Sequence, residues 1–221
     1  MRSKGASLVL ALLALTSCGF SQDDAVPLPA PRLSGEVTVE EALEARRSVR
    51  RYGNRSLTLE ETGQLLWAAA GVTSPRGFRT APSAGALYPF TVYLAAGRVD
   101  SLSPGIYRYE PLEHALIGLG QGDVREDLRE ACLGQSCVGE APASIILVAR
   151  ESVTTSVYGD RGRMYVHMEA GHISQNVYLQ CQALGLGTVA VGAFAPEALG
   201  GILGLPEGEK ALYVLPVGSL Q

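Results

Sequence analysis

The sequence predicts an α+β layer fold, in which helices cover a sheet whose strands are joined in part by hairpins. Two capping boxes, each a threonine followed three residues later by glutamate, open helices in the first third of the chain. Later stretches rich in β-branched and aromatic residues are typical of strands. One long apolar helix stands among them, and the helices and strands do not alternate regularly, which argues against a βαβ sheet.

The elements are expected in the following order. The capping box of Thr38 and Glu41 predicts a helix through about residue 48, and that of Thr58 and Glu61 a helix through Gly71. A loop rich in proline, glycine, serine and alanine follows at 73–88. Strands are expected at 90–96, 106–109, 115–119, 144–149, 188–194 and 211–217, the second and third forming a hairpin. Further helices are expected at 123–133, 161–184 and 196–203.

The helix at 161–184 is the longest of these elements. Asp160 stands in the position that caps its first turn, and Gly185 and Gly187 follow it as stop signals. Apolar or small residues occupy almost every side: Met164, Val166, Met168, Ala170, Gly171, Ile173, Val177, Leu179, Cys181 and Leu184. A helix that is apolar all round must be covered all round, and one sheet leaves part of it open. We therefore expect a second copy of the chain to cover the rest.

The composition excludes one broad class of partner. The 221 residues carry a formal net charge of -4, and a nucleic-acid-binding surface would need clustered basic residues in a basic domain. The hydrophobic content of 47% is enough for a sizeable core and gives no indication of disorder.

The first 35 residues predict a targeting segment and a tether. A basic start, an apolar run at 8–15 that is too short to span a bilayer, and small residues before Cys18 are typical of a bacterial lipoprotein signal. We expect a signal peptide at 1–17, lipid attachment at Cys18, a proline-rich tether over 18–35, and one domain over 36–221. This predicts an exported protein anchored to the membrane at the periplasmic face or in the cell envelope. An ordinary secretory signal with an incidental cysteine is the alternative.

The remaining cysteines and histidines indicate no metal site. Cys132 and Cys137 are near enough in sequence to pair in an exported protein, whereas Cys181 has the place of a small core residue. There is no CxxC motif and no Cys/His cluster with zinc spacing. Glu169 and His172 have the ExxH spacing of di-iron bundles, but a second such motif and further carboxylates are missing. We therefore expect these two residues in the core or at an interface.

A basic cluster follows the first expected helix and contains Arg46, Arg47, Ser48, Arg50 and Arg51. Four guanidinium groups within six residues repel one another unless an anion lies among them. Arginine side chains beside a hydroxyl suit a phosphate group, which accepts several charge-assisted hydrogen bonds. The alternative is a solvated basic face that pairs with Glu41 and Glu44.

Two glycine-containing stretches are candidates for backbone contact with a ligand. The segment 81–89, APSAGALYP, has small side chains that would let its backbone lie against a planar ligand, and a plain surface loop is the alternative. The segment 185–190, GLGTVA, has the letters of the dinucleotide fingerprint. A helix precedes it and a strand follows, which reverses the required order, so we interpret its glycines as a helix stop.

Taken in order, four segments resemble the nitroreductase superfamily, and most closely its SagB-type dehydrogenase branch. They are ARRSVRRY, APSAGALYPF, the run from YGDRGRMYVHMEAGHISQNVYLQC to GAF, and LYVLPVG, and they span about residues 37–218. The resemblance implies a central mixed or antiparallel sheet flanked by helices, with the long helix at the interface of a homodimer. It also implies that FMN binds at this interface, one molecule in each of two sites.

The resemblance assigns the basic cluster to the cofactor. Arg46 and Ser48 match the positions that hold the FMN phosphate, and Arg47 lies beside the ribityl chain. Arg50 matches the basic residue near flavin N1, where a cation stabilises the negative charge of the reduced ring.

Two further segments would contact the flavin ring. Gly192 and Ala193 match a turn whose backbone amides face N5. The loop that flanks the ring from the partner subunit is matched by Pro82, Ser83, Ala84, Gly85, Ala86 and Leu87.

The chain departs from the family pattern at three places. Ala86 stands where typical nitroreductases have an asparagine, and Gly218 to Gln221 include no basic residue to assist the phosphate site. Azoline-oxidising members of the branch carry a Lys-Tyr pair before the long helix, and Val157-Tyr158 takes that place here. Peptide azoline oxidation is therefore not expected, whereas Tyr158 remains a candidate proton donor; packing at the dimer interface is its alternative.

The resemblance predicts an FMN-dependent oxidoreductase that transfers hydride through flavin N5 in a ping-pong cycle, from a small-molecule donor to a small organic acceptor. The flavin supplies the chemistry, so no nucleophile is needed. The usual donor is a nicotinamide cofactor, which an exported domain would not meet. The alternative is a non-catalytic or flavin-sequestering exported lipoprotein that keeps the fold as a binding or docking module.

Overall fold

A computed structural model describes residues 25–221 of the chain. The expected signal peptide and the lipid attachment site at Cys18 lie outside the described residues. None of the helices among residues 25–221 is both long and apolar enough to cross a bilayer.

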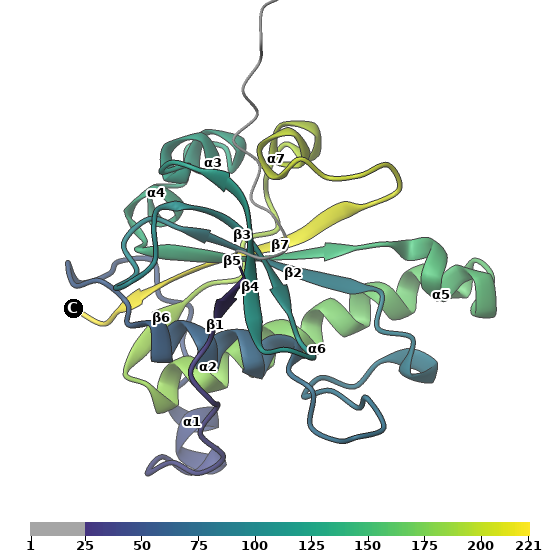
Figure 1. Cartoon of the computed structure of the whole chain (residues 1–221), viewed down its shortest axis with the longest axis horizontal. Coiled ribbons are helices and arrows are strands. Elements are labelled where there is room, and N and C mark those ends of the chain that lie inside the picture. The colour runs from purple at the N-terminus through teal and green to yellow at the C-terminus, as the bar shows by residue number, and fades with distance from the viewer. Residues whose placement is uncertain (1–24) are drawn as a thin grey trace, which may run out of the picture.

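One seven-stranded sheet forms the centre of the molecule, and all neighbouring strands in it are antiparallel (Figure 1). The order across the sheet is β1-β4-β3-β2-β5-β7-β6. The strands are β1 (Val26–Pro27), β2 (Phe90–Ala96), β3 (Gly105–Glu110), β4 (Ala115–Gln121), β5 (Ala143–Ala149), β6 (Leu186–Thr188) and β7 (Lys210–Ser219).

Helices cover both faces of this sheet (Figure 1). On one face lie α2 (Leu59–Ala70) and α6 (Arg161–Ala183), with α1 (Val39–Ala45) packed against α6. On the other face lie α3 (Arg125–Ala131), α4 (Ser136–Glu140) and α7 (Pro196–Leu203). The remaining elements are α5 (Glu151–Tyr158), which leads into α6, and the short 3₁₀ helix η2 (Ala84–Ala86).

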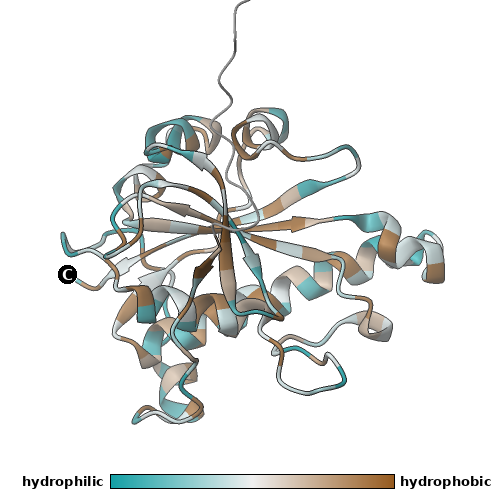
Figure 2. Cartoon of the chain, viewed as in Figure 1, coloured by the Kyte–Doolittle hydropathy of each residue, from teal (hydrophilic) through white to brown (hydrophobic). Residues whose placement is uncertain are grey.

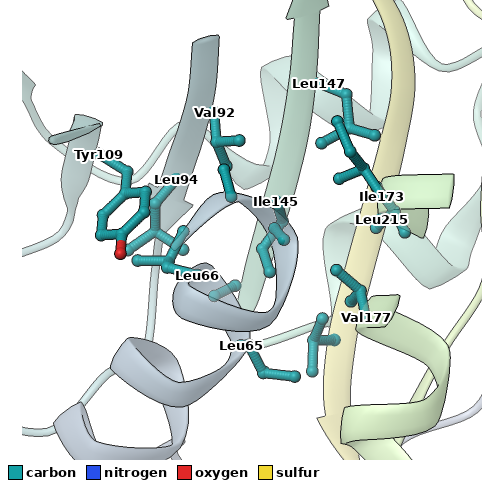
Figure 3. Packing of buried hydrophobic residues seen from close by; sticks show 14 of the residues in the cluster. Leu65, Leu66, Val92, Leu94, Tyr109, Ile145, Leu147, Ile173, Val177 and Leu215 are labelled. Atoms are coloured by element: carbon teal, nitrogen blue, oxygen red, sulfur yellow. The ribbon is translucent and has the colours of Figure 1, made fainter. Parts of the chain in front are cut away.

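Strand β5 divides the interior into two cores. Ile145 and Leu147 face α2 and α6 (Figure 3), whereas Ile146 and Val148 face α3, α4 and α7. Successive strand residues point to opposite faces, so a strand covered on both sides has to be apolar throughout. The central strands are accordingly among the most hydrophobic parts of the chain (Figure 2). Each buried leucine or isoleucine contributes about 1.5–3 kcal/mol.

Several sequence-based predictions are confirmed. Both capping boxes form, with the threonine side chain accepting a hydrogen bond from the glutamate backbone and the glutamate side chain accepting one in return. The strand at 90–96 and the helix at 196–203 have the predicted bounds, and β3 and β4 form the expected hairpin. The fold class is the predicted one, and its sheet is antiparallel.

The first helix ends three residues earlier than predicted. It stops at Ala45, and the backbone of Arg46 is already extended, with φ -52° and ψ 122°. The Val49 amide donates to the Thr188 carbonyl at 2.9 Å, and Ser48 pairs with Thr188 in a parallel bridge. The edge of the sheet therefore satisfies the backbone groups that a longer helix would have satisfied internally.

Two helices were missed, and the capping role predicted for Asp160 is wrong. The missed helices are α4 and α5, and the second ends just before Gly159, whose φ is +56°. Asp160 has helical dihedral angles and makes no capping hydrogen bond. A tight turn between α5 and α6 begins the long helix instead, through backbone hydrogen bonds such as that from Gly162 to the Gly159 carbonyl.

The strand predicted at 188–194 is mostly irregular. Regular pairing ends at Thr188, and Val191 makes an isolated bridge to Val214. The Ala190 amide turns away from the sheet and donates to a side chain of α6, as described below. Gly185 is a helix stop, with φ +66°, but Gly187 lies in β6, where a Cβ atom would come within 2.7 Å of the Val49 side chain.

Helix α6 is covered on one face by its own chain. Val166, Ile173 and Val177 are fully buried, whereas Met164 and Met168 are 45% and 49% exposed. Cys181 is a buried core residue, and Cys132 and Cys137 are buried free thiols. Exposed methionines on the longest helix leave an apolar surface for another molecule to cover.

Candidate functional site

The basic segment, residues 46–51, runs in extended conformation beside β6 at the edge of the sheet. Side chains alternate along an extended segment, so Arg46 and Ser48 are expected on the same side. A guanidinium group and a hydroxyl group lie together there, because both contact one tyrosine of α6.

The arginines of the basic segment have no acidic partner in the described part of the chain. Within residues 25–221, no carboxylate lies within 4.0 Å of the guanidinium groups of Arg46, Arg47, Arg50 or Arg51. The alternative pairing with Glu41 and Glu44 does not form. Glu41 caps its own helix through Thr38, and Arg47 donates to the backbone carbonyl of Glu44. The positive charge of this segment is therefore not neutralised by the carboxylates of residues 25–221.

A tyrosine of α6, which sequence reasoning did not single out, lies against this segment. The Tyr178 hydroxyl is 3.0 Å from Ser48 Oγ and accepts a hydrogen bond from the Ala190 amide at 2.9 Å. The Arg46 guanidinium lies over its ring, 5.3 Å from the centroid. Nothing local in the sequence reveals these contacts, because they join residues up to 130 positions apart.

The turn after β6 presents backbone donors. Within the described part of the chain, neither the Gly192 nor the Ala193 amide donates a hydrogen bond to the protein, and both residues are exposed. Gln135 Nε2 donates to the Ala193 carbonyl at 3.0 Å and so holds the turn in place. A cavity of about 520 Å³ opens beside it, lined by His167, Ala170, Gly192, Phe194, Pro196, Lys210, Ala211, Leu212 and Tyr213.

The small-residue loop at 82–87 is attached to α5 and α6. The Pro82 carbonyl lies 3.3 Å from His172 Nδ1, and Ser83 Oγ accepts a hydrogen bond from the Tyr88 amide at 2.9 Å. Gly85 has φ +61°, and a Cβ atom there would come within 2.8 Å of the Tyr158 hydroxyl. Glycine adopts this backbone conformation without strain, and any larger residue would displace the Tyr158 hydroxyl. Ala86 also has a positive φ, so the loop has a defined shape.

Tyr158 belongs to this loop and lies apart from the basic segment. Its ring packs edge-on against Tyr165 with the centroids 5.2 Å apart, and its side chain is partly exposed. The hydroxyl reaches the backbone at Gly85.

A buried carboxyl group, Glu169 of α6, lies beneath the same loop. Burial raises the pKa of Glu169 to about 7, while a hydrogen bond from Ser83 and the charge of Arg79 oppose the rise. The sequence indicated a core or interface position for Glu169 and His172; Glu169 is buried, and His172 is exposed beside the loop. A carboxyl group with this pKa exchanges a proton near neutral pH.

Within one chain, the basic segment with Tyr178 and the loop at 82–87 with Tyr158 and Glu169 lie at different places along α6. The turn at Gly192 follows Ala190, which contacts Tyr178, and its cavity is also lined by His167 and Ala170 of α6. Tyr178 and Glu169 are nine residues apart on α6, which corresponds to roughly 13 Å along the helix axis.

Comparisons with known proteins identify the family of the chain. The family model described as the nitroreductase family matches residues 43–219. The Methanocaldococcus jannaschii protein MJ1384 is 45% identical over 183 residues, which cover 83% of this chain and 91% of that protein. A crystal structure from Ralstonia eutropha has a TM-score of 0.77 and 31% identity, covering 89% of this chain and 90% of that one. Both relatives bear the name putative nitroreductase.

A more distant neighbour shares the fold. The NADPH:FMN oxidoreductase of Vibrio harveyi has a TM-score of 0.59 at 18% identity, covering 82% of this chain and 68% of that one. The family match, which extends from the end of α1 to the end of β7, takes in the basic segment, the loop at 82–87 and the turn at Gly192. The chain thus belongs to the nitroreductase family and is an oxidoreductase of the nitroreductase type.

Proposed function

We propose that this oxidoreductase is a flavoprotein of the SagB-type branch, which binds FMN between two copies of the chain. The observation that carries the proposal is the row of guanidinium groups in residues 46–51 that have no carboxylate partner among the described residues. Cations crowded in this way are stabilised by a phosphate, which arginine binds through paired hydrogen bonds.

The residues present suit the chemistry of FMN. Arg46 and Ser48 would hold the phosphate, Arg47 would lie beside the ribityl chain, and Arg50 would stand near flavin N1. The amides of Gly192 and Ala193, which have no acceptor within residues 25–221, would donate to the ring edge at N5. The cavity of about 520 Å³ beside Gly192 is of the size usual for small-molecule sites.

A second copy of the chain would complete each site. The loop of residues 82–87 contacts α6 at His172, whereas the basic segment contacts it at Tyr178. In one chain, these two parts of the proposed site therefore lie at different places along the helix. The exposed Met164 and Met168 lie on α6. Pairing two chains through this helix would bury these methionines and would bring the loop of one chain to the flavin of the other.

When bound, FMN supplies the redox chemistry, a hydride taken up and released at N5 in a ping-pong cycle between a small-molecule donor and a small organic acceptor. The chain would orient the cofactor and stabilise its reduced form. Arg50 offsets the negative charge of the reduced ring, and the Gly192 and Ala193 amides fix its edge. The loop at 82–87 of the partner copy would flank the ring. Tyr158, whose hydroxyl lies near Gly85, would deliver a proton to an acceptor bound there.

The N-terminal pattern bears on where this reaction would take place. We propose that lipid at Cys18 anchors the protein to the membrane at the periplasmic face or in the cell envelope, with 18–35 as a tether. The electron donor would then be a reductant present in that compartment.

The test is flavin binding by the purified domain. We expect a yellow protein whose visible absorbance is bleached by dithionite or a hydride donor and restored by a quinone or nitroarene. Arg46→Ala and Ser48→Ala should each weaken FMN binding about tenfold or more, because each removes a charge-assisted hydrogen bond to the phosphate. Leu112→Ala, in the exposed turn between β3 and β4, is the control. A chain that ignores added FMN, or substitutions that leave its affinity unchanged, would contradict the proposal.

A further inference from the structure

Tyr178 contacts three parts of the basic half of the site at once. Its hydroxyl oxygen lies 3.0 Å from Ser48 Oγ and 2.9 Å from the Ala190 nitrogen, and its ring carries the Arg46 guanidinium on one face. Ser48 and Arg46 are the two side chains that the proposed function assigns to the phosphate. Among the described residues, no other side chain contacts both Ser48 Oγ and the Arg46 guanidinium.

The donors and acceptors around this hydroxyl determine where its proton can go. The Ala190 amide can only donate, so it uses a lone pair of the Tyr178 oxygen. The phenol proton can then be donated to Ser48 Oγ, which has no other partner among residues 25–221. In that arrangement, the Ser48 hydroxyl keeps its own proton for a further acceptor on its free side.

In the reverse arrangement Ser48 donates to Tyr178, so the Ser48 proton is not available to a ligand and the free hydroxyl proton is that of Tyr178. Without a ligand the two arrangements are both compatible with the 3.0 Å distance. An anion next to Ser48 selects the first, because it accepts the Ser48 proton while Tyr178 donates in turn. Hydrogen bonds linked in this way strengthen one another.

The aromatic ring has a separate effect on Arg46. A guanidinium within about 6 Å of a ring centroid is attracted to the face of the ring, and Arg46 is at 5.3 Å. This contact leaves the charge of Arg46 without a counter-ion but restricts the rotamers of a long side chain. The entropy lost when a ligand fixes that side chain is correspondingly smaller.

We propose that Tyr178 is a positioning residue of the phosphate site: it directs the Ser48 hydroxyl proton and the Arg46 guanidinium toward the phosphate of FMN. This inference rests on the proposed function. A merely structural role, in which Tyr178 only fastens α6 to residue 190, would affect all ligands of the site alike.

The experiment compares FMN with riboflavin, which has the same ring system and ribityl chain but no phosphate. Their dissociation constants are measured by fluorescence quenching for the wild type, Tyr178→Phe, Ser48→Ala and the double variant. Tyr178→Phe keeps the ring beneath Arg46 and removes only the hydroxyl. We expect the FMN dissociation constant to rise about three- to tenfold in this variant while that of riboflavin stays the same. In the Ser48→Ala background the substitution should add no further loss.

Tyr107→Phe is the matched control. It also removes a phenol hydrogen bond, to the Ser103 carbonyl at 2.7 Å, but on β3, four strands from the basic segment. It should leave both dissociation constants unchanged. Urea unfolding of each variant is compared with that of the wild type to verify that the variant is folded.

If the wild type binds FMN, two results for Tyr178→Phe would overturn the inference while leaving the proposed function intact. The dissociation constants of FMN and riboflavin would rise equally, or neither constant would change. A wild type that binds no FMN, or a Ser48→Ala variant with normal affinity, would instead overturn the proposed phosphate site itself.

Discussion

Glu169 is a carboxyl group that α6 buries beneath the loop at 82–87. Its side chain is 4% exposed, and burial is the largest cause of the rise in its pKa from 4.5 to about 7. Between these two values the unfolded chain releases the proton while the folded chain keeps it. The free energy of unfolding must therefore fall as the pH rises from about 4.5 to about 7, and level off above that.

The variant Glu169→Gln should remove this dependence, because the amide is uncharged at every pH. A shift of this size corresponds to about 3 kcal/mol, so the variant should gain stability relative to the wild type by up to that amount between pH 4.5 and pH 8. Urea unfolding at several pH values measures both proteins, and the comparison cancels the other groups that titrate. Parallel stability curves would show that Glu169 ionises normally in the folded chain.

At the scale of elements, the contact between β6 and the basic segment decides where the arginines lie. Gly187 faces Val49 so closely that a Cβ atom would lie 2.7 Å from the valine Cβ and Cγ1. Gly187→Ala should therefore push the segment away from the sheet edge, lower the free energy of unfolding by about 1–3 kcal/mol and weaken FMN binding.

Gly200→Ala in α7 is the control for that substitution. A Cβ atom at Gly200 meets nothing within 4 Å, and alanine is the better helix former by up to about 1 kcal/mol. Thermal unfolding and FMN titration of the two variants compare them directly. If Gly187→Ala matched the wild type in both measurements, the close packing of Val49 on β6 would not position the arginines.

Local signals made some elements predictable. The capping boxes at Thr38 and Thr58 specify helix starts through residues three positions apart. Helix α5 was missed because its sequence, ESVTTSVY, is rich in β-branched residues, which favour helix only weakly. The first helix was predicted too long because its end depends on pairing with Thr188, 140 residues away.

The same distinction applies to the candidate site. The basic cluster and the small-residue loop stand out as short runs, so the sequence predicted them. The core or interface position of Glu169 was expected, but its contacts with Ser83 and Arg79, like those of Tyr178 with Ser48, join side chains that the fold brings together, and no local pattern indicated them.

At the scale of the whole molecule, the account requires two chains. One chain covers only one face of α6, and the exposed Met164 and Met168 remain on it. The proposed flavin site needs the basic segment of one chain and the loop of another, so dimerisation and cofactor binding should be lost together.

Met168→Glu places a charge on the proposed interface at an already exposed position and should yield a folded monomer with little flavin. Leu112→Glu adds the same charge at a residue that is 77% exposed in the turn between β3 and β4, and should leave both properties unchanged.

Sedimentation velocity of the purified protein, recorded at both protein and flavin wavelengths with FMN supplied in excess, is the most direct test. We predict that the wild type and Leu112→Glu sediment as dimers that carry one flavin per chain, and that Met168→Glu sediments as a largely colourless monomer. A wild-type monomer without flavin, or a Met168→Glu monomer that keeps a full complement of flavin, would contradict a flavin site shared by two chains.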